Sequence, residues 1–170
     1  MASGRPSRRQ PHKRTLVWTQ RRISCVAVTE PRNRTMTLIR SLQIYAVTLG
    51  IFFAIDLVWL GVVAKDFYRQ HIGHLLAAEV NWTAAVLFYL MFIGGLVFFA
   101  VKPALESGSG MRALGYGALF GLLTYATYDL TNQATMRDWP VLVTVVDLAW
   151  GTVLSASVAF LSYQVSSRAF

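Results

Sequence analysis

The chain has 170 residues, of which 55% are hydrophobic and only 14% are charged. Ordinary soluble domains carry about 25% charged residues, so this composition argues against a soluble globular protein. The single cysteine, Cys25, excludes an intrachain disulfide framework and any zinc or iron–sulfur site built from cysteines.

Positive charge is concentrated at the N-terminus. Residues 1–40 hold ten of the sixteen lysines and arginines and one acid, whereas residues 41–170 hold six basic and seven acidic residues. Residues 1–35 keep no helical period of apolar residues, and we predict a disordered basic tail there. Four interpretations of the tail stay open: a misplaced start before Met36, an organelle transit peptide, a strip lying on anionic lipid, and a segment that binds nucleic acid without specificity.

Four apolar segments follow the tail, each close to the roughly 20 residues that a helix needs to cross the hydrocarbon layer. They are residues 41–64, 82–101, 113–130 and 141–163. The strict alternation of apolar and polar residues that marks a membrane barrel is absent from the sequence. We therefore predict an all-α fold, a four-helix transmembrane bundle formed by residues 36–170, with the lipid bilayer as its surroundings.

Basic residues that flank the segments set the expected orientation. Lys102 and Arg112 lie in the middle connection and Arg168 lies near the C-terminus, on the same side as the arginines before the first segment. On the other side, acidic residues balance the basic ones. We expect both termini to face the cytoplasm.

The first connection, residues 65–81, contains His71 and His74. Two histidines with one carboxylate could bind a metal, but no third ligand has a suitable spacing, so we predict an amphipathic connector and no metal. Tyr68 here and Trp139 before the last segment are expected at the membrane interface as amphipathic anchors. No phosphate-binding or dinucleotide-binding motif is present, and we expect no cofactor.

A short string occurs in both the first and the fourth segments. DLVWLG at residues 56–61 recurs as DLAWG at residues 147–151, and NW at 81–82 resembles DWP at 138–140. These pairs suggest two helical hairpins related as a parallel repeat. So few matched positions also fit a chance resemblance.

Three acids inside the apolar segments, Asp56, Asp129 and Asp147, are the most informative residues. A charged side chain at a helix centre costs about 2.5–3.5 kcal/mol on insertion scales. All three fall in the non-cytoplasmic half of the four-segment arrangement, so a shared polar pocket is the economical explanation. Burial and like-charge proximity both favour the protonated acid, and we expect a proton-sharing cluster. The alternative is a structural role, in which each acid only holds neighbouring helices together.

Helix spacing gives these acids companions. Trp59 and Trp150 each follow an acid by three residues, so each indole shares a face with a carboxyl group and can donate its N–H. Tyr125 and Asn132 share a face with Asp129 in the third segment. We predict that these four side chains line the pocket.

Gly117 and Gly121 precede this polar stretch and form a surface of small residues that allows a neighbouring helix to approach closely. Four helices are few for a transporter, which would then need a second copy of the chain. We regard these glycines as helix-packing residues and as a candidate contact in a homodimer.

Four strings of the apolar part are specific enough to suggest relatives: DLVWLG at 56–61, NW at 81–82, TYATYDLTN at 124–132 and VDLAWG at 146–151. They resemble a family of small bacterial predicted membrane proteins of unknown function. The resemblance covers about residues 36–170 and implies a multi-pass protein of the bacterial inner (plasma) membrane. It also implies that the chain proper begins near Met36, and it implies no reaction.

Three hypotheses for the function stay open. The first is proton-linked binding or transport of a small ligand, or service as the membrane subunit of a larger complex. The second is a membrane enzyme that acts on a lipid and uses paired aspartates as general acid and base. The third is a structural assembly protein whose acids bind helices to one another.

Overall fold

Helices make up nearly all of the chain that the computed structural model describes, residues 38–169. In chain order they are α1 (Leu38–Val58), α2 (Lys65–Ile72), α3 (Trp82–Leu96), α4 (Lys102–Ser107), α5 (Gly110–Thr135) and α6 (Val141–Ala169). The π-helical turn η1 (Trp59–Val63) continues α1, the π-helical turn η3 (Val97–Val101) joins α3 to α4, and the 3-10 turn η2 (Gly73–Leu75) follows α2. The predicted all-α class is thus confirmed for these residues, while the predicted basic tail of residues 1–35 lies outside them.

Three helical segments are long and apolar enough to cross a membrane: Leu38–Val63, Trp82–Ser107 and Val141–Ala169. They correspond to the first, second and fourth of the predicted segments. The third predicted segment lies within α5, whose 26 residues give it sufficient length. Threonines, tyrosines and Asp129 make α5 less apolar than the other three, and its membrane crossing stays a prediction.

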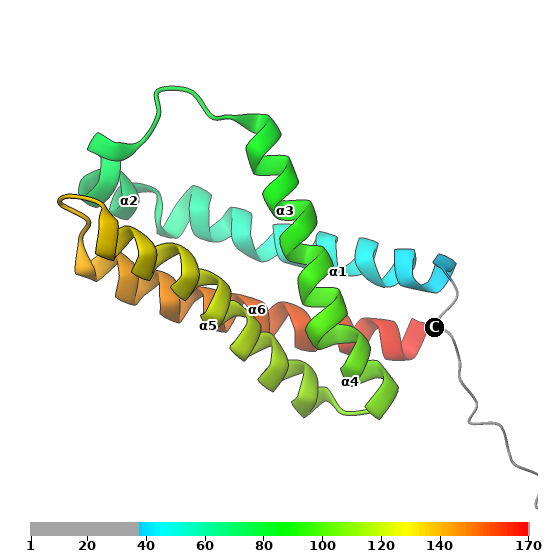
Figure 1. The fold of residues 1–170 in the computed structure, drawn as a ribbon. Helices are drawn as coiled ribbons and strands as arrows, with labels where there is room; N and C mark the ends of the chain where they lie inside the picture. Colours follow the sequence, from blue (N-terminus) through cyan, green and yellow to red (C-terminus); the bar gives the residue numbers. More distant parts are fainter. Residues whose placement is uncertain (1–37, 170) are drawn as a thin grey trace, which may run out of the picture. The chain divides into compact units, whose positions relative to one another are not determined.

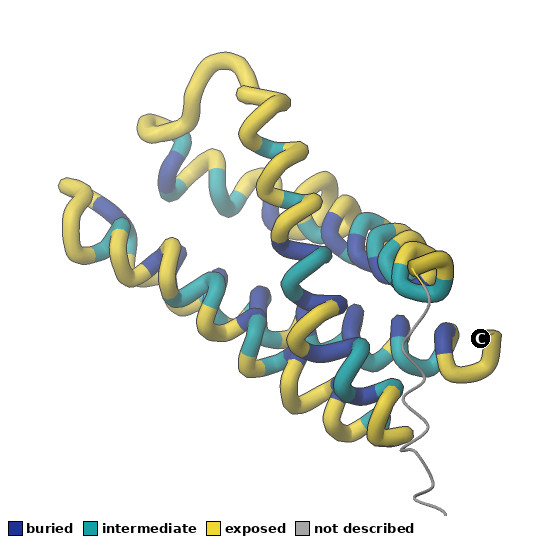
Figure 2. Tube along the Cα trace, turned by 45° about the vertical axis from the view of Figure 1, so that its right-hand side comes forward, coloured by how far each residue is buried: buried dark blue, intermediate teal, exposed yellow. Residues whose placement is uncertain are grey.

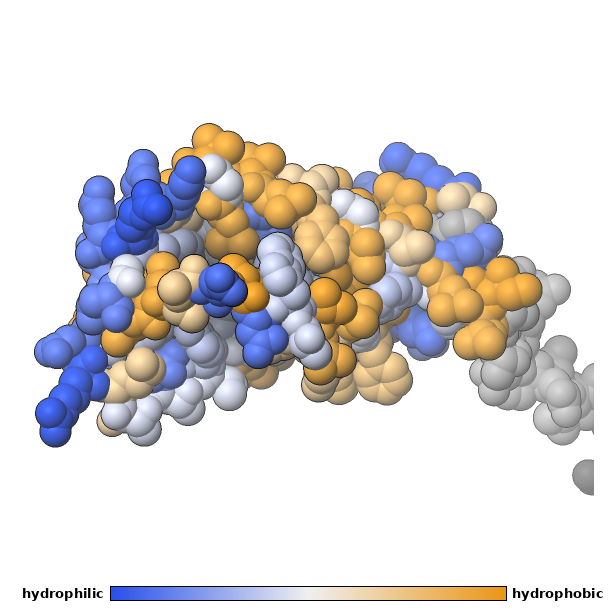
Figure 3. Space-filling model, turned by 90° about the horizontal axis from the view of Figure 1, so that it is seen from above, coloured by the Kyte–Doolittle hydropathy of each residue, from blue (hydrophilic) through white to orange (hydrophobic). Residues whose placement is uncertain are grey.

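Successive long helices run in opposite directions (Figure 1). The start of α1, the turn between α4 and α5 and the end of α6 lie at one end of the bundle. Helix α2 and the turn between α5 and α6 lie at the other end, which we call the α2 end. On the face seen in Figure 3, hydrophobic side chains cover the middle and hydrophilic ones gather at the α2 end. This distribution suits a helical bundle surrounded by lipid.

Local sequence signals set the helix ends. Asn81 begins α3, because its side chain accepts a hydrogen bond from the backbone N–H of Ala84 at 3.1 Å, and Ser109 begins α5 in the same way. Gly108 ends α4 with a φ of 64°, a conformation that glycine adopts without steric cost. Each boundary thus has a residue suited to it.

Helices α5 and α6 approach each other closely because small residues face small residues. A Cβ atom on Gly117 would lie 2.6 Å from the carbonyl oxygen of Ser155, and one on Gly121 would overlap the carbonyl oxygen of Gly151. Both glycines therefore pack against α6 of the same chain. The expectation that they pair two copies of the chain is wrong, since this surface is already occupied.

The main core lies in the half of the bundle away from the α2 end. It is built from apolar side chains of α1, α3, η3 and α6, including Ile44, Phe52, Ile93, Leu96, Ala100, Val101, Leu154 and Val158. The buried residues of α3 begin at Phe92, whereas its first ten residues are mostly exposed (Figure 2). Within these ten residues, Tyr89 packs against the edge of the core. Helix α3 is therefore buried in one half and largely exposed in the other, which we call its free half.

A second, smaller cluster ties α2 to the beginning of α6. Ile72, Trp139 and Val143 are buried together, with Phe67 and Tyr68 packed against them. Trp139 is 6% exposed, and its indole N–H donates to the hydroxyl of Thr144 at 3.0 Å. The prediction that Trp139 anchors the chain at the membrane interface is therefore wrong, because the ring packs inside the protein.

Candidate functional site

The carboxyl groups of Asp129 on α5 and Asp147 on α6 lie side by side. Asp129 is 0% exposed and Asp147 is 8% exposed. The two groups are near enough to influence each other electrostatically, and no N–H or O–H group of the described residues hydrogen-bonds to Asp129. Two negative charges this close in a site of low dielectric repel strongly, so the pair suits one shared proton.

Tyr68 connects α2 to this pair. Its hydroxyl donates a short hydrogen bond to Oδ1 of Asp147 and lies 3.4 Å from the indole nitrogen of Trp59, which donates to it. Burial and the hydrogen bond to Asp147 raise the pKa of the Tyr68 phenol, so the phenol remains a protonated donor. The prediction of Tyr68 as an interface anchor missed this contact, which places α2 over the acid pair.

Asp56 occupies a separate position on α1. It is 3% exposed, and its Oδ2 accepts a hydrogen bond from the hydroxyl of Tyr89 at 3.3 Å. The indole N–H of Trp150 approaches the same carboxyl group without reaching hydrogen-bonding geometry. Asp56 is thus grouped with side chains of α3 and α6.

The two tryptophans of the repeated string meet face to face. The rings of Trp59 and Trp150 are 4.1 Å apart between centroids with an interplanar angle of 10°. Trp59 projects from η1, which continues α1, and Trp150 projects from α6, which runs in the opposite direction to α1 (Figure 1). A parallel repeat of hairpins would place equivalent strings on helices that run the same way, so these strings do not support that arrangement.

Tyr125 is near both acidic positions. It is within electrostatic reach of Asp56 and Asp147 and of the hydroxyls of Tyr68 and Tyr89. Gly151 makes room for it, because a Cβ atom there would overlap the Tyr125 ring. The glycine of the DLAWG string therefore has a steric role in placing Tyr125.

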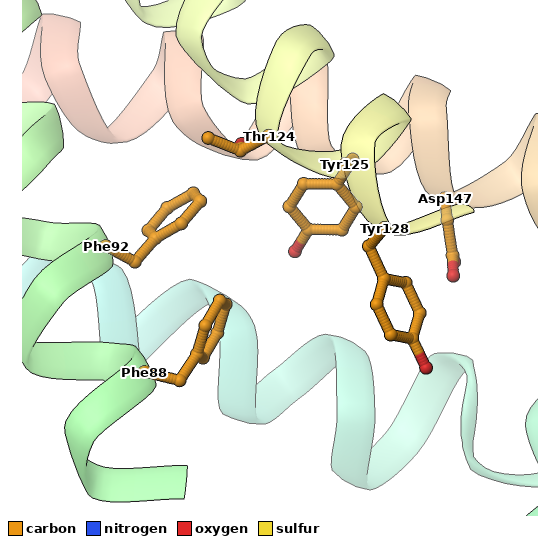
Figure 4. A pocket seen from close by; sticks show the side chains of 6 residues that line it. All are labelled: Phe88, Phe92, Thr124, Tyr125, Tyr128 and Asp147. Atoms are coloured by element: carbon orange, nitrogen blue, oxygen red, sulfur yellow. The ribbon is translucent and has the colours of Figure 1, made fainter. Parts of the chain in front are cut away.

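A cavity of about 340 Å³ opens beside this group, between α3 and α5. Six residues line it: Phe88, Phe92, Thr124, Tyr125, Tyr128 and Asp147. In Figure 4 the phenylalanine rings of α3 face the tyrosine rings of α5 across the opening, and Asp147 lies beyond Tyr128. The cavity forms where the first half of α3 departs from α5.

The residues predicted for the pocket thus fall into three groups. Asp129 and Asp147 form a pair, while Asp56 is placed apart from them and is linked through three side chains, Trp59, Trp150 and Tyr125. The side chain of Asn132 lies near the hydroxyl of Tyr128.

A family model described as "Predicted membrane protein (DUF2177)" matches residues 41–164. The chain belongs to this family. The resemblance predicted from the sequence strings is confirmed, and the segment shared with DUF2177 contains all three buried acids. Comparison with curated proteins and with solved structures finds no match.

Several side chains of this DUF2177 protein lie at the site without having been assigned to it from the sequence: Tyr68, Phe88, Tyr89, Phe92 and Tyr128. A usable signal existed for Tyr89, which carries the only hydroxyl in the middle of the second apolar segment. A buried hydroxyl in an apolar helix requires a partner, and Asp56 is that partner. No comparable signal existed for the phenylalanines, because their role depends on the departure of α3 from the bundle.

Proposed function

We propose that this protein binds a small ligand at a carboxyl pair that holds one exchangeable proton. The observation that carries the proposal is the buried pair of Asp129 and Asp147 next to a cavity that Asp147 lines. Buried ionisable groups in membrane helices mark binding sites or proton pathways more often than structural contacts. Ligand binding and protonation then compete for the same oxygen atoms.

The surroundings of the pair favour a proton as the resting partner. The groups that act on it are Tyr68 from α2, Tyr128 and Tyr125 from α5, and each acid on the other. None of these side chains carries positive charge. A ligand or a proton must therefore compensate the negative charge of Asp147.

Infrared spectroscopy of the full chain in lipid nanodiscs tests this proposal. A protonated carboxyl group absorbs separately from a carboxylate, so we expect a carboxyl band at neutral pH that disappears when the solution is made alkaline. Asp147→Asn and Asp129→Asn should each remove this band, since each leaves one carboxyl group without its partner.

Asp138→Asn is the matched control for these variants. Asp138 is exposed in the turn before α6 and has a φ of 58°, a conformation in which asparagine is well tolerated. It should leave the band unchanged. A carboxyl band that survives in both Asp147→Asn and Asp129→Asn contradicts the proposal. If the wild type shows no carboxyl band and the two variants do not fold, the acids have a purely structural role.

We further propose that residues 36–170 form a four-pass domain with both termini in the cytoplasm. The alternating directions of α1, α3, α5 and α6 support four crossings (Figure 1). The basic residues Lys102, Arg112 and Arg168 lie at the end opposite α2 and support the orientation. In this orientation α2 lies on the side of the membrane opposite the cytoplasm.

Cysteine accessibility tests this orientation in a Cys25→Ser background. His74→Cys and Met136→Cys, at the α2 end, should react with an impermeant reagent added outside intact cells, and Ser107→Cys should react only after the membrane is opened. The reverse pattern inverts the topology. Labelling of all three from outside contradicts the four-pass arrangement.

A further inference from the structure

The cavity is lined by aromatic rings and by a carboxyl group. Helix packing by itself does not require these two kinds of group in one place. Four aromatic residues line the cavity, two from α3 and two from α5, and the acid Asp147 lines it from α6. The ring centroids of Phe92 and Tyr125 are 6.3 Å apart with an interplanar angle of 82°, and those of Phe88 and Phe92 are 5.6 Å apart. The rings therefore present faces and edges in different directions around one space.

Aromatic faces carry partial negative charge and attract cations that lie above them. Rings grouped in this way with a carboxylate bind ammonium groups, whose charge is spread over a bulky and weakly hydrated head. The cavity of about 340 Å³ is at the lower end of the range for ligand sites. It can take an ammonium head together with the first carbons of a chain.

A second, apolar hollow lies along α5. Its volume is about 450 Å³, and its lining residues are Phe99, Tyr116, Leu119, Phe120, Leu123 and Thr124. Thr124 lines both spaces, so both lie against the same turn of α5. A ligand with a cationic head and an alkyl chain would fill both, with its chain among side chains that are otherwise covered by lipid.

We propose that the cavity binds the ammonium head of a membrane-dissolved amphiphilic amine, with Asp147 as the counter-charge and the alkyl chain along the hollow of α5. The proposal rests on the proposed function, because the ammonium group takes the place of the proton on the acid pair. Binding displaces that proton to water, so the total charge of the occupied site stays the same. The ligand enters from the bilayer between α3 and α5, where Phe88 and Tyr128 are more than half exposed.

Dodecyltrimethylammonium, below its micellar concentration, is the probe for this site. Its comparator is dodecyldimethylamine N-oxide, which has the same chain and a head of similar size without net charge. Saturable binding to the full chain in phosphatidylcholine nanodiscs is measured by isothermal titration calorimetry, with empty nanodiscs to subtract partitioning into lipid. We expect the ammonium compound to bind at least about tenfold more tightly than the N-oxide, because only the former has a charge-assisted contact with Asp147.

Two pairs of variants separate the charge from the aromatic rings. Asp147→Asn should weaken binding by at least about tenfold, whereas Asp138→Asn should leave it unchanged. Phe88→Leu removes one ring of the cavity and should weaken binding about threefold or more. Phe98→Leu is its control, since Phe98 is 63% exposed and lies outside both hollows.

Equal binding of the two compounds overturns the proposal. Unchanged binding of the ammonium compound to Asp147→Asn also overturns it. If Asp147→Asn does not fold, unchanged binding to Phe88→Leu does the same. The infrared measurement distinguishes this failure from failure of the proposed function. A carboxyl band that is present but does not decrease when the ammonium compound is added leaves the proton-sharing pair standing and rejects the amine as its ligand. A band that decreases on addition, in proportion to the binding isotherm, supports both.

Discussion

The two halves of the bundle are held together by different kinds of contact. Away from the α2 end, buried aliphatic side chains from α1, α3, η3 and α6 form a continuous core. Toward the α2 end, a small apolar cluster around Trp139 joins α2 to α6. The other contacts there are a hydrogen bond from Tyr68 to Asp147, one from Tyr89 to Asp56, and the stacked rings of Trp59 and Trp150. The first half is filled by packing, and the second encloses a cavity.

This difference shows how a small membrane protein keeps a polar site without losing its fold. Close contacts of α5 with α6 and the core around Leu96 fix the helices along part of their length. The site can then be polar and incompletely filled, because its helices are already positioned from the other half. Variants that act on one half and spare the other test this division.

The largest effect is expected from Leu96→Ala in the packed half of α3. Leu96 is fully buried, and truncation of a buried leucine costs about 2–5 kcal/mol through lost contacts and the space left behind. Leu87→Ala, in the free half of the same helix, changes a side chain that is 55% exposed and should cost less than about 0.5 kcal/mol. Reversible unfolding in mixed detergent micelles gives both free energies. Equal costs for the two variants would show that α3 packs evenly along its length.

A smaller loss is expected from Gly121→Ala in α5. The added methyl group would overlap the carbonyl oxygen of Gly151, and such overpacking costs about 1–3 kcal/mol. Gly115→Ala on the same helix places its methyl group in open space and should leave stability unchanged or raise it by up to about 1 kcal/mol. The same unfolding measurement applies. A neutral Gly121→Ala would contradict the close approach of α5 and α6.

The smallest effect on stability is expected from Tyr68→Phe at the α2 end. It removes the hydroxyl that donates to Asp147 and accepts from Trp59, which should cost about 1 kcal/mol. The carboxyl band of the acid pair should shift in the infrared spectrum, since one hydrogen bond to Asp147 is gone. Tyr116→Phe, on a half-exposed tyrosine of α5, is the control. An unshifted carboxyl band in Tyr68→Phe would show that α2 makes no contact with the acid pair.

Much of the helical arrangement could be predicted because its signals are local. The predicted second and fourth segments begin at residues 82 and 141, and α3 and α6 begin at Trp82 and Val141. Gly117 and Gly121 predict close packing by a neighbouring helix, and that helix is α6 of the same chain, although a second copy of the chain was also a candidate. A surface of small residues specifies that a helix comes near, and not which helix.

The candidate site was harder to predict, because it depends on contacts between distant helices. Burial of Asp56, Asp129 and Asp147 followed from the cost of charge in lipid. Their division into a pair and a separate residue did not, since it depends on how far each helix is rotated about its axis. Tyr68 was missed because a tyrosine near a membrane interface has an ordinary explanation as an anchor.

The π-helical turn η1 has a consequence for the geometry of the acid pair. The backbone N–H of Ala64 bonds to the carbonyl oxygen of Trp59 at 2.7 Å, so this turn accommodates one residue more than an α-helical turn. Such a turn takes up an extra residue locally, so the helix on either side of it keeps its facing. Trp59 at its start stacks on Trp150, and Tyr68 beyond its end donates to Asp147. The turn thus adds chain length between these two contacts without turning either of them away from the site.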